Sequence, residues 1–188
     1  DLQSDMIYGS DVKFSAYNFV YENENGKETE KKLDGNTAVI YNGIAKPDYS
    51  KENISPEIGW VKLIDNNSDG KTDVLNVFNA DLTLVSGKVS ANADLYVITD
   101  KFNNSKYVKL DSDQLDDTEI FVNGEPGNIG NIKEDMLVIR GINGEHTVIY
   151  AYDNSITGKV ESITDDELRV DGKIYKVSKS CDISAAKL

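Results

Sequence analysis

The chain of 188 residues lacks most of what a disulfide-stabilised or membrane-spanning protein requires. Cys181 is the only cysteine, so an internal disulfide is impossible, and His146 is the only histidine. Neither has a neighbouring motif that would make it a nucleophile, a base or a zinc ligand, so we expect both to be dispensable for folding and binding. No apolar run approaches the roughly 18 residues of a membrane-spanning helix, and we expect no membrane insertion.

Positive charge is also scarce. Lys and Arg number 20 against 33 Asp and Glu, which gives a formal net charge of -13. A nucleic-acid partner needs clustered cations to displace counterions, and an anionic membrane surface needs a polybasic segment, so neither partner is expected. This balance suits an extracellular protein or a binder of cations.

Helical periodicity is nearly absent, and apolar and polar residues alternate along most of the chain, as in strands with one buried face. Asn-Gly or Asp-Gly pairs at 25–26, 143–144 and 171–172 separate such runs and suit tight hairpin turns. The three prolines all lie between the expected strands, where a missing N–H costs least. The sequence therefore predicts an all-β fold with very little helix.

Two stretches occur twice in the same order. Residues 37–43 (TAVIYNG) return at 118–124 (TEIFVNG), and residues 85–90 (VSGKVS) return at 156–161 (ITGKVE). Such self-similarity predicts a tandem array of small β-barrel-like modules of about six short strands each. We place the modules at 1–85, 86–156 and 157–188, the last being a partial module or strands that complete an earlier one. If the repeat is structural, 60–64 should occupy the same place in the first module as 136–140 in the second.

Residues 158–163 (GKVESI) and 168–177 (LRVDGKIYKV), with the earlier Asn-Gly strands, resemble repeats of clostridial, Gram-positive cell-surface proteins. Those proteins also carry surface-layer-homology domains, none of which is present in this sequence. The resemblance covers most of the chain from Asp34 onward and implies a secreted, wall-associated S-layer type of β module without a known catalytic activity. The chain begins at Asp1 without a methionine, which is expected of a mature fragment or an excised piece.

An acidic loop at 65–73 (DNNSDGKTD) has the alternating oxygen pattern of a calcium-binding loop. The predicted ligands are the side chains of Asp65, Asn67, Asp69 and Asp73 and the carbonyl of Lys71. An EF-hand would have a glutamate at the twelfth position, where this chain has Asn76, and the flanks are expected to be strands. The alternative is an ordinary polar turn, because turns favour the same residue types.

An aromatic stripe is formed by Tyr17, Phe19 and Tyr21, which lie on one face of an expected strand. Such a stripe can meet a cell-wall polymer or another surface protein, or it can pack a core. No nucleotide-binding or hydrolase motif is present, and adjacent carboxylates such as Asp116-Asp117 point to opposite faces of a strand, so we expect no enzymatic activity. The sequence thus predicts a non-catalytic, secreted cell-surface spacer or assembly module, in which calcium binding would stabilise the acidic loop. The alternatives are a carbohydrate- or protein-binding module and an accessory domain of a carbohydrate-active enzyme.

Overall fold

The computed structural model describes residues 3–8, 12–14, 18–23, 27–46, 54, 56, 58–87, 89–92, 94–153, 155–164 and 167–177. The chain forms two compact units, Asp1–Asp153 and Asn154–Leu188. The module boundaries near residues 85 and 156 stay predictions. Among the described residues no helix is long and apolar enough to cross a membrane.

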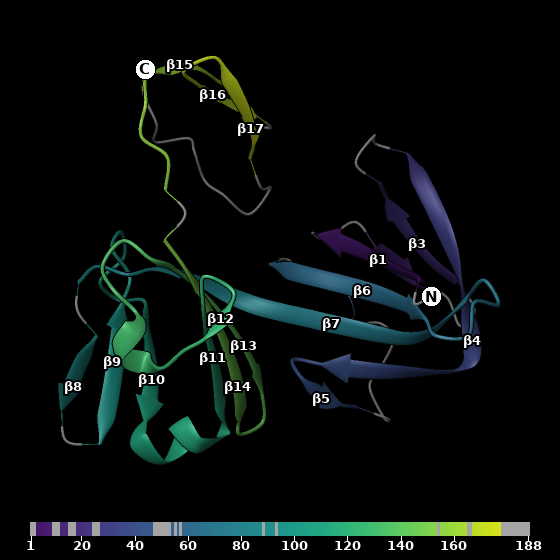
Figure 1. Cartoon of the computed structure of the whole chain (residues 1–188), viewed down its shortest axis with the longest axis horizontal. Helices are drawn as coiled ribbons and strands as arrows, with labels where there is room; N and C mark the ends of the chain where they lie inside the picture. Colours follow the sequence, from purple (N-terminus) through teal and green to yellow (C-terminus); the bar gives the residue numbers. More distant parts are fainter. Residues whose placement is uncertain are drawn as a thin grey trace. The chain divides into compact units, whose positions relative to one another are not determined.

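The prediction of an all-β chain is confirmed, because strands dominate and the described helical segments are two short 3-10 helices, η2 (Ser112–Asp117) and η3 (Ile129–Asn131). The strands of the first unit are β1 (Gln3–Tyr8), β2 (Val12–Phe14), β3 (Asn18–Glu22), β4 (Glu28–Tyr41), β5 (Ile44–Ala45), β6 (Gly59–Asp65), β7 (Lys71–Leu84), β8 (Ser90–Asn92), β9 (Leu95–Thr99), β10 (Tyr107–Asp111), β11 (Thr118–Val122), β12 (Glu125–Pro126), β13 (Leu137–Asn143) and β14 (His146–Tyr152). Those of the second unit are β15 (Val160–Ile163), β16 (Glu167–Val170) and β17 (Lys173–Lys176). Figure 1 shows their arrangement.

The matching stretches of sequence form the same local sheet twice. In the first repeat the strand order is β5-β4-β7-β6-β1, and in the second it is β12-β11-β14-β13-β7. The central pair is parallel in both, β4 with β7 and β11 with β14, although the other pairs are antiparallel. Val61 pairs with Val77 as Val138 pairs with Ala151, so 60–64 corresponds to 137–141, one residue from the predicted match.

The Asn-Gly turns of the two repeats are also built alike. Asn42 and Asn123 both have positive φ, 45° and 54°, and each is followed by a glycine with φ near 87°. The backbone N–H of Asn42 donates to the carbonyl of Val77, and that of Asn123 donates to the carbonyl of Ala151, both at 2.9 Å. The repeated sequence therefore specifies a repeated hydrogen-bond pattern.

Strand β7 belongs to both repeats. In the first repeat its residues between 71 and 77 pair with β4 and its residues 74–79 pair with β6, whereas residues 80–84 pair with β13 of the second repeat. All 14 residues of β7 form one strand, and its sequence contains neither glycine nor proline to interrupt it. The C-terminal part of β7 pairs with β13 as β1 pairs with β6, so the last strand of one repeat is the first strand of the next.

Each repeat also contains a three-stranded meander before its Asn-Gly strand. In the first repeat the meander consists of β2, β3 and the N-terminal part of β4. In the second repeat it is β8-β9-β10, and in the second unit it is β15-β16-β17. The resemblance to cell-surface repeats begins only at Asp34. In the structure, however, β2 and β3 are connected and paired in the same order as β8 and β9. A shared topology here survives without shared residue types, because strand pairing depends mainly on alternation and backbone hydrogen bonds.

Two hydrophobic cores lie in the first unit. The first core contains Phe19, Leu33, Val39, Ile54, Val61, Leu63, Leu75 and Val77. The second core contains Val85, Ile98, Val108, Leu110, Ile120, Ile129, Ile132, Met136, Val138, Ile149 and Ala151. Each core joins a meander to the sheet of the same repeat.

The described strands do not form the closed, barrel-like modules that the sequence predicted. They make one sheet of 11 strands and two sheets of three strands, and none of the three closes on itself within the described residues. The physical reason is strand β7, which leaves the first repeat to pair with the second and so extends the sheet instead of closing it.

A row of aromatic rings crosses the boundary between the repeats. The ring centroids of Trp60 and Phe78 lie 5.6 Å apart, those of Phe78 and Tyr150 5.3 Å, and those of Tyr150 and Phe121 5.2 Å. Gly141 of β13 makes this possible, because a Cβ there would lie 2.6 Å from a ring carbon of Phe78. The glycine lets Phe78 of β7 reach Tyr150 of β14 across the intervening strand.

We therefore expect Gly141→Ala to lower the free energy of unfolding by about 1–3 kcal/mol through overpacking. Chemical denaturation followed by tryptophan fluorescence measures the change, because Trp60 stands at one end of the aromatic row. Gly35→Ala is the control, since a Cβ at Gly35 meets nothing within 4 Å. Equal stability of the two variants would show that the aromatic row is not tightly packed.

Candidate functional site

The acidic loop joins β6 to β7 and is held by the carboxylate of Asp65. The two carboxylate oxygens accept hydrogen bonds from the backbone N–H groups of Asn67 at 3.3 Å, Ser68 at 2.6 Å and Gly70 at 2.8 Å. Burial raises the pKa of Asp65, but these hydrogen bonds outweigh it and hold the pKa below its ordinary value. Asp65 is therefore an ionised anchor of the loop.

The other predicted ligands take part in the same kind of bonding. Asn67 accepts from the N–H of Asp69, and Asp69 accepts from the N–H of Lys71, both at 2.9 Å. Asp73 accepts from the N–H of Asn66 at 2.8 Å. The ammonium of Lys71 lies 3.8 Å from the carboxylate of Asp69, which reduces the repulsion between the acidic side chains.

The structure thus gathers all five predicted ligand residues at one hairpin, with Asp65 at the end of β6, Asn67 and Asp69 in the loop, and Lys71 and Asp73 at the start of β7. Within the described part of the chain, no group of three or more His, Cys, Asp and Glu side chains is arranged so that it could hold a metal ion. The hydrogen bonds explain the loop as a polar turn that its own backbone closes. Calcium binding by this loop stays a prediction.

The aromatic stripe divides in the structure. Phe19 is fully buried and belongs to the first core, so it takes the packing role that an aromatic stripe can have. Tyr21 is partly buried against the same core, with its ring centroid 6.2 Å from that of Phe19. Tyr17 lies outside the described residues, and a binding role for the stripe stays a prediction.

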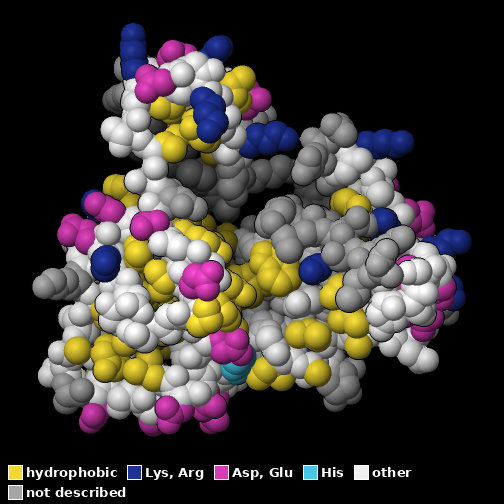
Figure 2. All heavy atoms as spheres, viewed as in Figure 1, with side chains coloured by type: hydrophobic (Ala, Val, Ile, Leu, Met, Phe, Trp, Pro, Cys, Tyr) yellow, Lys and Arg dark blue, Asp and Glu magenta, His cyan; other side chains and the backbone are white. Residues whose placement is uncertain are grey.

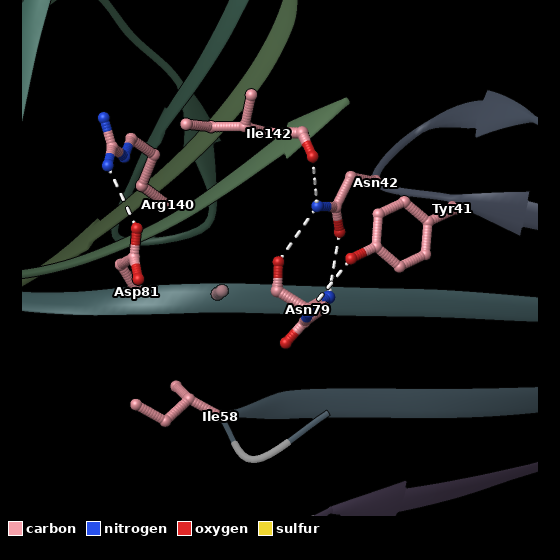
Figure 3. Close-up of a pocket in the computed structure, with 8 residues that line it drawn as sticks. Tyr41, Asn42, Ile58, Asn79, Asp81, Arg140 and Ile142 are labelled. Carbon is pink, nitrogen blue, oxygen red and sulfur yellow. Dashed lines mark hydrogen bonds and ion pairs between the residues drawn. The ribbon is translucent and has the colours of Figure 1, made fainter. Parts of the chain in front are cut away.

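The best-defined polar cluster is a joint between the two repeats, centred on Asn42 (Figure 3). Asn42 is 1% exposed, and its amide nitrogen donates to the carbonyls of Asn79 and Ile142, both at 2.9 Å. Its amide oxygen accepts from the N–H of Asn79 at 2.9 Å. One side chain therefore fixes the turn of the first repeat to β7 and to β13 of the second.

The hairpin of the second repeat holds the same turn from the other side. The amide of Asn143 donates to the carbonyl of Tyr41 at 2.7 Å. A Cβ on Gly43 would lie 2.8 Å from a ring nitrogen of His146, so the glycine is needed for close approach as well as for its positive φ. The Nε2 of His146, the cyan side chain in Figure 2, lies 3.4 Å from the carboxylate of Glu119.

A cavity of about 420 Å³ opens beside this joint. It is lined by Tyr41, Asn42, Ile58, Asn79, Ala80, Asp81, Arg140 and Ile142. The guanidinium of Arg140 pairs with Asp81 across β13 and β7 at 3.0 Å, while its Nε is buried without a hydrogen-bond partner. The sequence marked 143–144 only as a turn, and the buried role of Asn42 had no signal beyond its repetition at Asn123.

His146 lies at the joint beside the turn glycine Gly43 and the carboxylate of Glu119. Cys181 lies outside the described residues. The dispensability of both for activity stays a prediction, although His146 contributes packing at the joint.

A second buried carboxylate, Asp100, ties the end of β7 to the second repeat. It accepts hydrogen bonds from the N–H groups of Leu84 at 3.1 Å, Phe102 at 2.9 Å and Asn103 at 3.0 Å. Burial raises the pKa of Asp100, but these bonds and the charge of Lys106 together hold the pKa below its ordinary value.

We expect Asn42→Ala to lower the free energy of unfolding by about 1–3 kcal/mol, because it removes three hydrogen bonds that the buried Asn42 amide makes to Asn79 and Ile142. Asn123→Ala is the matched control, since Asn123 shares the positive φ but is exposed, and its side chain accepts a hydrogen bond from the N–H of Asp153. Urea denaturation of the two variants measures the difference. A loss at Asn123 as large as that at Asn42 would contradict the buried-joint explanation.

We expect Asp100→Asn to reduce stability at neutral pH and to flatten its dependence on pH. A carboxyl with a lowered folded-state pKa stabilises the fold above its unfolded pKa of about 3.9, and this contribution is lost as pH falls through the folded value. Stability measured from pH 7 to pH 2 should therefore fall less in the variant. Asp94→Asn, at an exposed position, should keep the profile of the parent.

Comparison with known proteins places the chain beside a bacterial surface protein. No protein-family model and no solved structure matches it. It is 28% identical over 172 residues to a surface layer protein of Brevibacillus choshinensis. The match covers 81% of this chain and 15% of that protein, so the chain spans a small part of its relative's length. Over most of its residues, the chain is similar to one segment of a surface layer protein.

Proposed function

We propose that the chain is a non-catalytic structural module of a secreted bacterial cell-surface protein, which acts as a spacer or assembly unit. The observation that carries the proposal is strand β7, which is shared by two repeats. A shared strand and the buried Asn42 joint prevent the repeats from turning independently, and a spacer of defined length needs such stiffness. The similarity to a surface layer protein and the net charge of -13 agree with an extracellular location.

The clostridial resemblance and the surface-layer-homology context belong to the same proposal. In this view the chain is one stretch of a longer wall-associated protein, and other parts of that protein attach it to the wall. The module itself then needs neither a catalytic site nor a wall-binding site.

The runner-up function is a carbohydrate- or protein-binding module. The cavity beside the Asn42 joint favours it, because Tyr41, Asn79, Asp81 and Arg140 offer both donors and acceptors around an open space. Tyr21 offers a second, partly buried aromatic surface.

Sedimentation of the purified chain with isolated Gram-positive wall fragments separates the two functions. A spacer should sediment no more than an unrelated protein of similar size and charge. Saturable binding that Arg140→Ala abolishes, with the fold retained by circular dichroism, would replace the spacer function by the binding function. Release of soluble sugar from the fragments would instead indicate an enzyme.

Calcium binding by the acidic loop is the second part of the proposal. The carboxylates of Asp65, Asp69 and Asp73 have acceptor capacity beyond their backbone bonds, because each carboxylate offers about four lone-pair positions. A cation would also offset the repulsion among them. The second repeat turns with Asn143-Gly144 at the same place, so any effect should be confined to the first repeat.

We expect calcium at a hundredfold excess over its Kd to stabilise the chain by about 2.7 kcal/mol. Thermal unfolding in calcium and in chelator measures this, and Asp69→Ala should remove the difference. Glu145→Ala, in the turn of the second repeat, is the control. Identical melting curves for the parent protein in both buffers would reduce the loop to a polar turn.

A further inference from the structure

The second unit repeats the meander of the second repeat with the same pairing. Asn92 lies opposite Leu95 and Ala91 opposite Tyr96 in β8 and β9. In β15 and β16, Ile163 lies opposite Leu168 and Ser162 opposite Arg169. Tyr96 and Arg169 therefore occupy equivalent positions. In the next strand Leu110 pairs with Tyr96 and Ile174 pairs with Arg169, so Ile174 is equivalent to Leu110.

The equivalent positions differ sharply in exposure. Val85 and Leu110 are 1% and 3% exposed, and both belong to the second core. Ile156, which matches Val85 in the repeated sequence, is 51% exposed. Ile174, which corresponds to Leu110, is 54% exposed. Two apolar positions that close a core in one repeat are therefore open in the other.

The partner of such a meander is visible in the complete repeats. In the second repeat, Val85 and Leu110 share a core with Ile120 of β11, Val138 of β13 and Ile149 of β14. In the first repeat, Phe19 of the meander shares a core with strands β6 and β7 in the same way. In each complete repeat, the core is therefore formed by apolar side chains of the meander together with those of the sheet.

The described part of the second unit has a very small buried core. Among its described residues, Val170 is the one hydrophobic side chain that is buried. Units below about 40 residues usually need a disulfide, a metal or a partner to be stable, and a three-stranded sheet needs an apolar face that is covered. Arg169, at the position of Tyr96, forms an ion pair with Glu161 at 3.1 Å, which offsets its charge next to Ile174.

We propose that β15–β17 is a docking surface for the sheet of a further repeat, built like β11–β14 and following β17 in a longer polypeptide. That sheet would cover Ile156 and Ile174 as β11–β14 covers Val85 and Leu110. The inference rests on the contacts within the repeats and does not depend on the cell-surface role.

The test extends the full chain at its C-terminus with a second copy of residues 118–153, which contain β11–β14. Amide hydrogen exchange of β15–β17 should become slower by on the order of tenfold in the extended chain, and Ile174→Ser should abolish this gain. The control extension has serine at the positions of Ile120, Val138 and Ile149 and should give no gain. Exchange that is unchanged by the intact extension, or slowed equally by the control, would overturn the proposal.

A measurement on the unextended chain tests the same surface. Ile174→Ser should leave the melting temperature and exchange of the chain unchanged, whereas Leu110→Ser should lower the melting temperature. A destabilising effect of Ile174→Ser would mean that the surface is already covered. Sedimentation should show a monomer, and a dimer that Ile174→Ser dissociates would assign the surface to a second copy and overturn the proposal.

Discussion

Strand β7 must stay continuous for 14 residues, and the rest of the first unit depends on this. Its N-terminal part lies between β4 and β6 in the sheet of the first repeat, and its C-terminal part is the first strand in the sheet of the second. A break between these parts would leave two separate sheets joined by a loop. The hydrogen bonds of the strand are thus what converts a repeated sequence into a single extended structure.

Side chains at the boundary reinforce this continuity with two different kinds of interaction. On one side the buried Asn42 amide forms hydrogen bonds with backbone groups of β7 and β13. On another, Phe78 passes over Gly141 to reach Tyr150. The hydrogen bonds of the buried amide fix the register, and the edge-to-face aromatic contact adds apolar burial.

Acidic side chains in this protein carry structural work that a count of charges does not suggest. Asp65 and Asp100 each bind several backbone N–H groups and close a loop next to one end of β7. Their pKa values are lowered because the bonded N–H groups favour the ionised form over the burial that opposes it. The net charge of -13 therefore includes carboxylates that organise loops as well as those that face solvent.

The sequence by itself determined the all-β class, the tandem repeat and the Asn-Gly turns, since alternation and turn residues act over a few neighbouring positions. It also located the acidic loop, because the bonds that Asp65, Asn67, Asp69 and Asp73 accept from backbone N–H groups lie within nine residues of chain. Tertiary structure alone decided that the sheets stay open, that Phe19 is core, and that Asn42 is a joint while Asn123 is an exposed turn. These differences depend on residues about 100 positions apart, such as Asn42 and Ile142, and local sequence patterns contain no information about which distant strand arrives beside a turn.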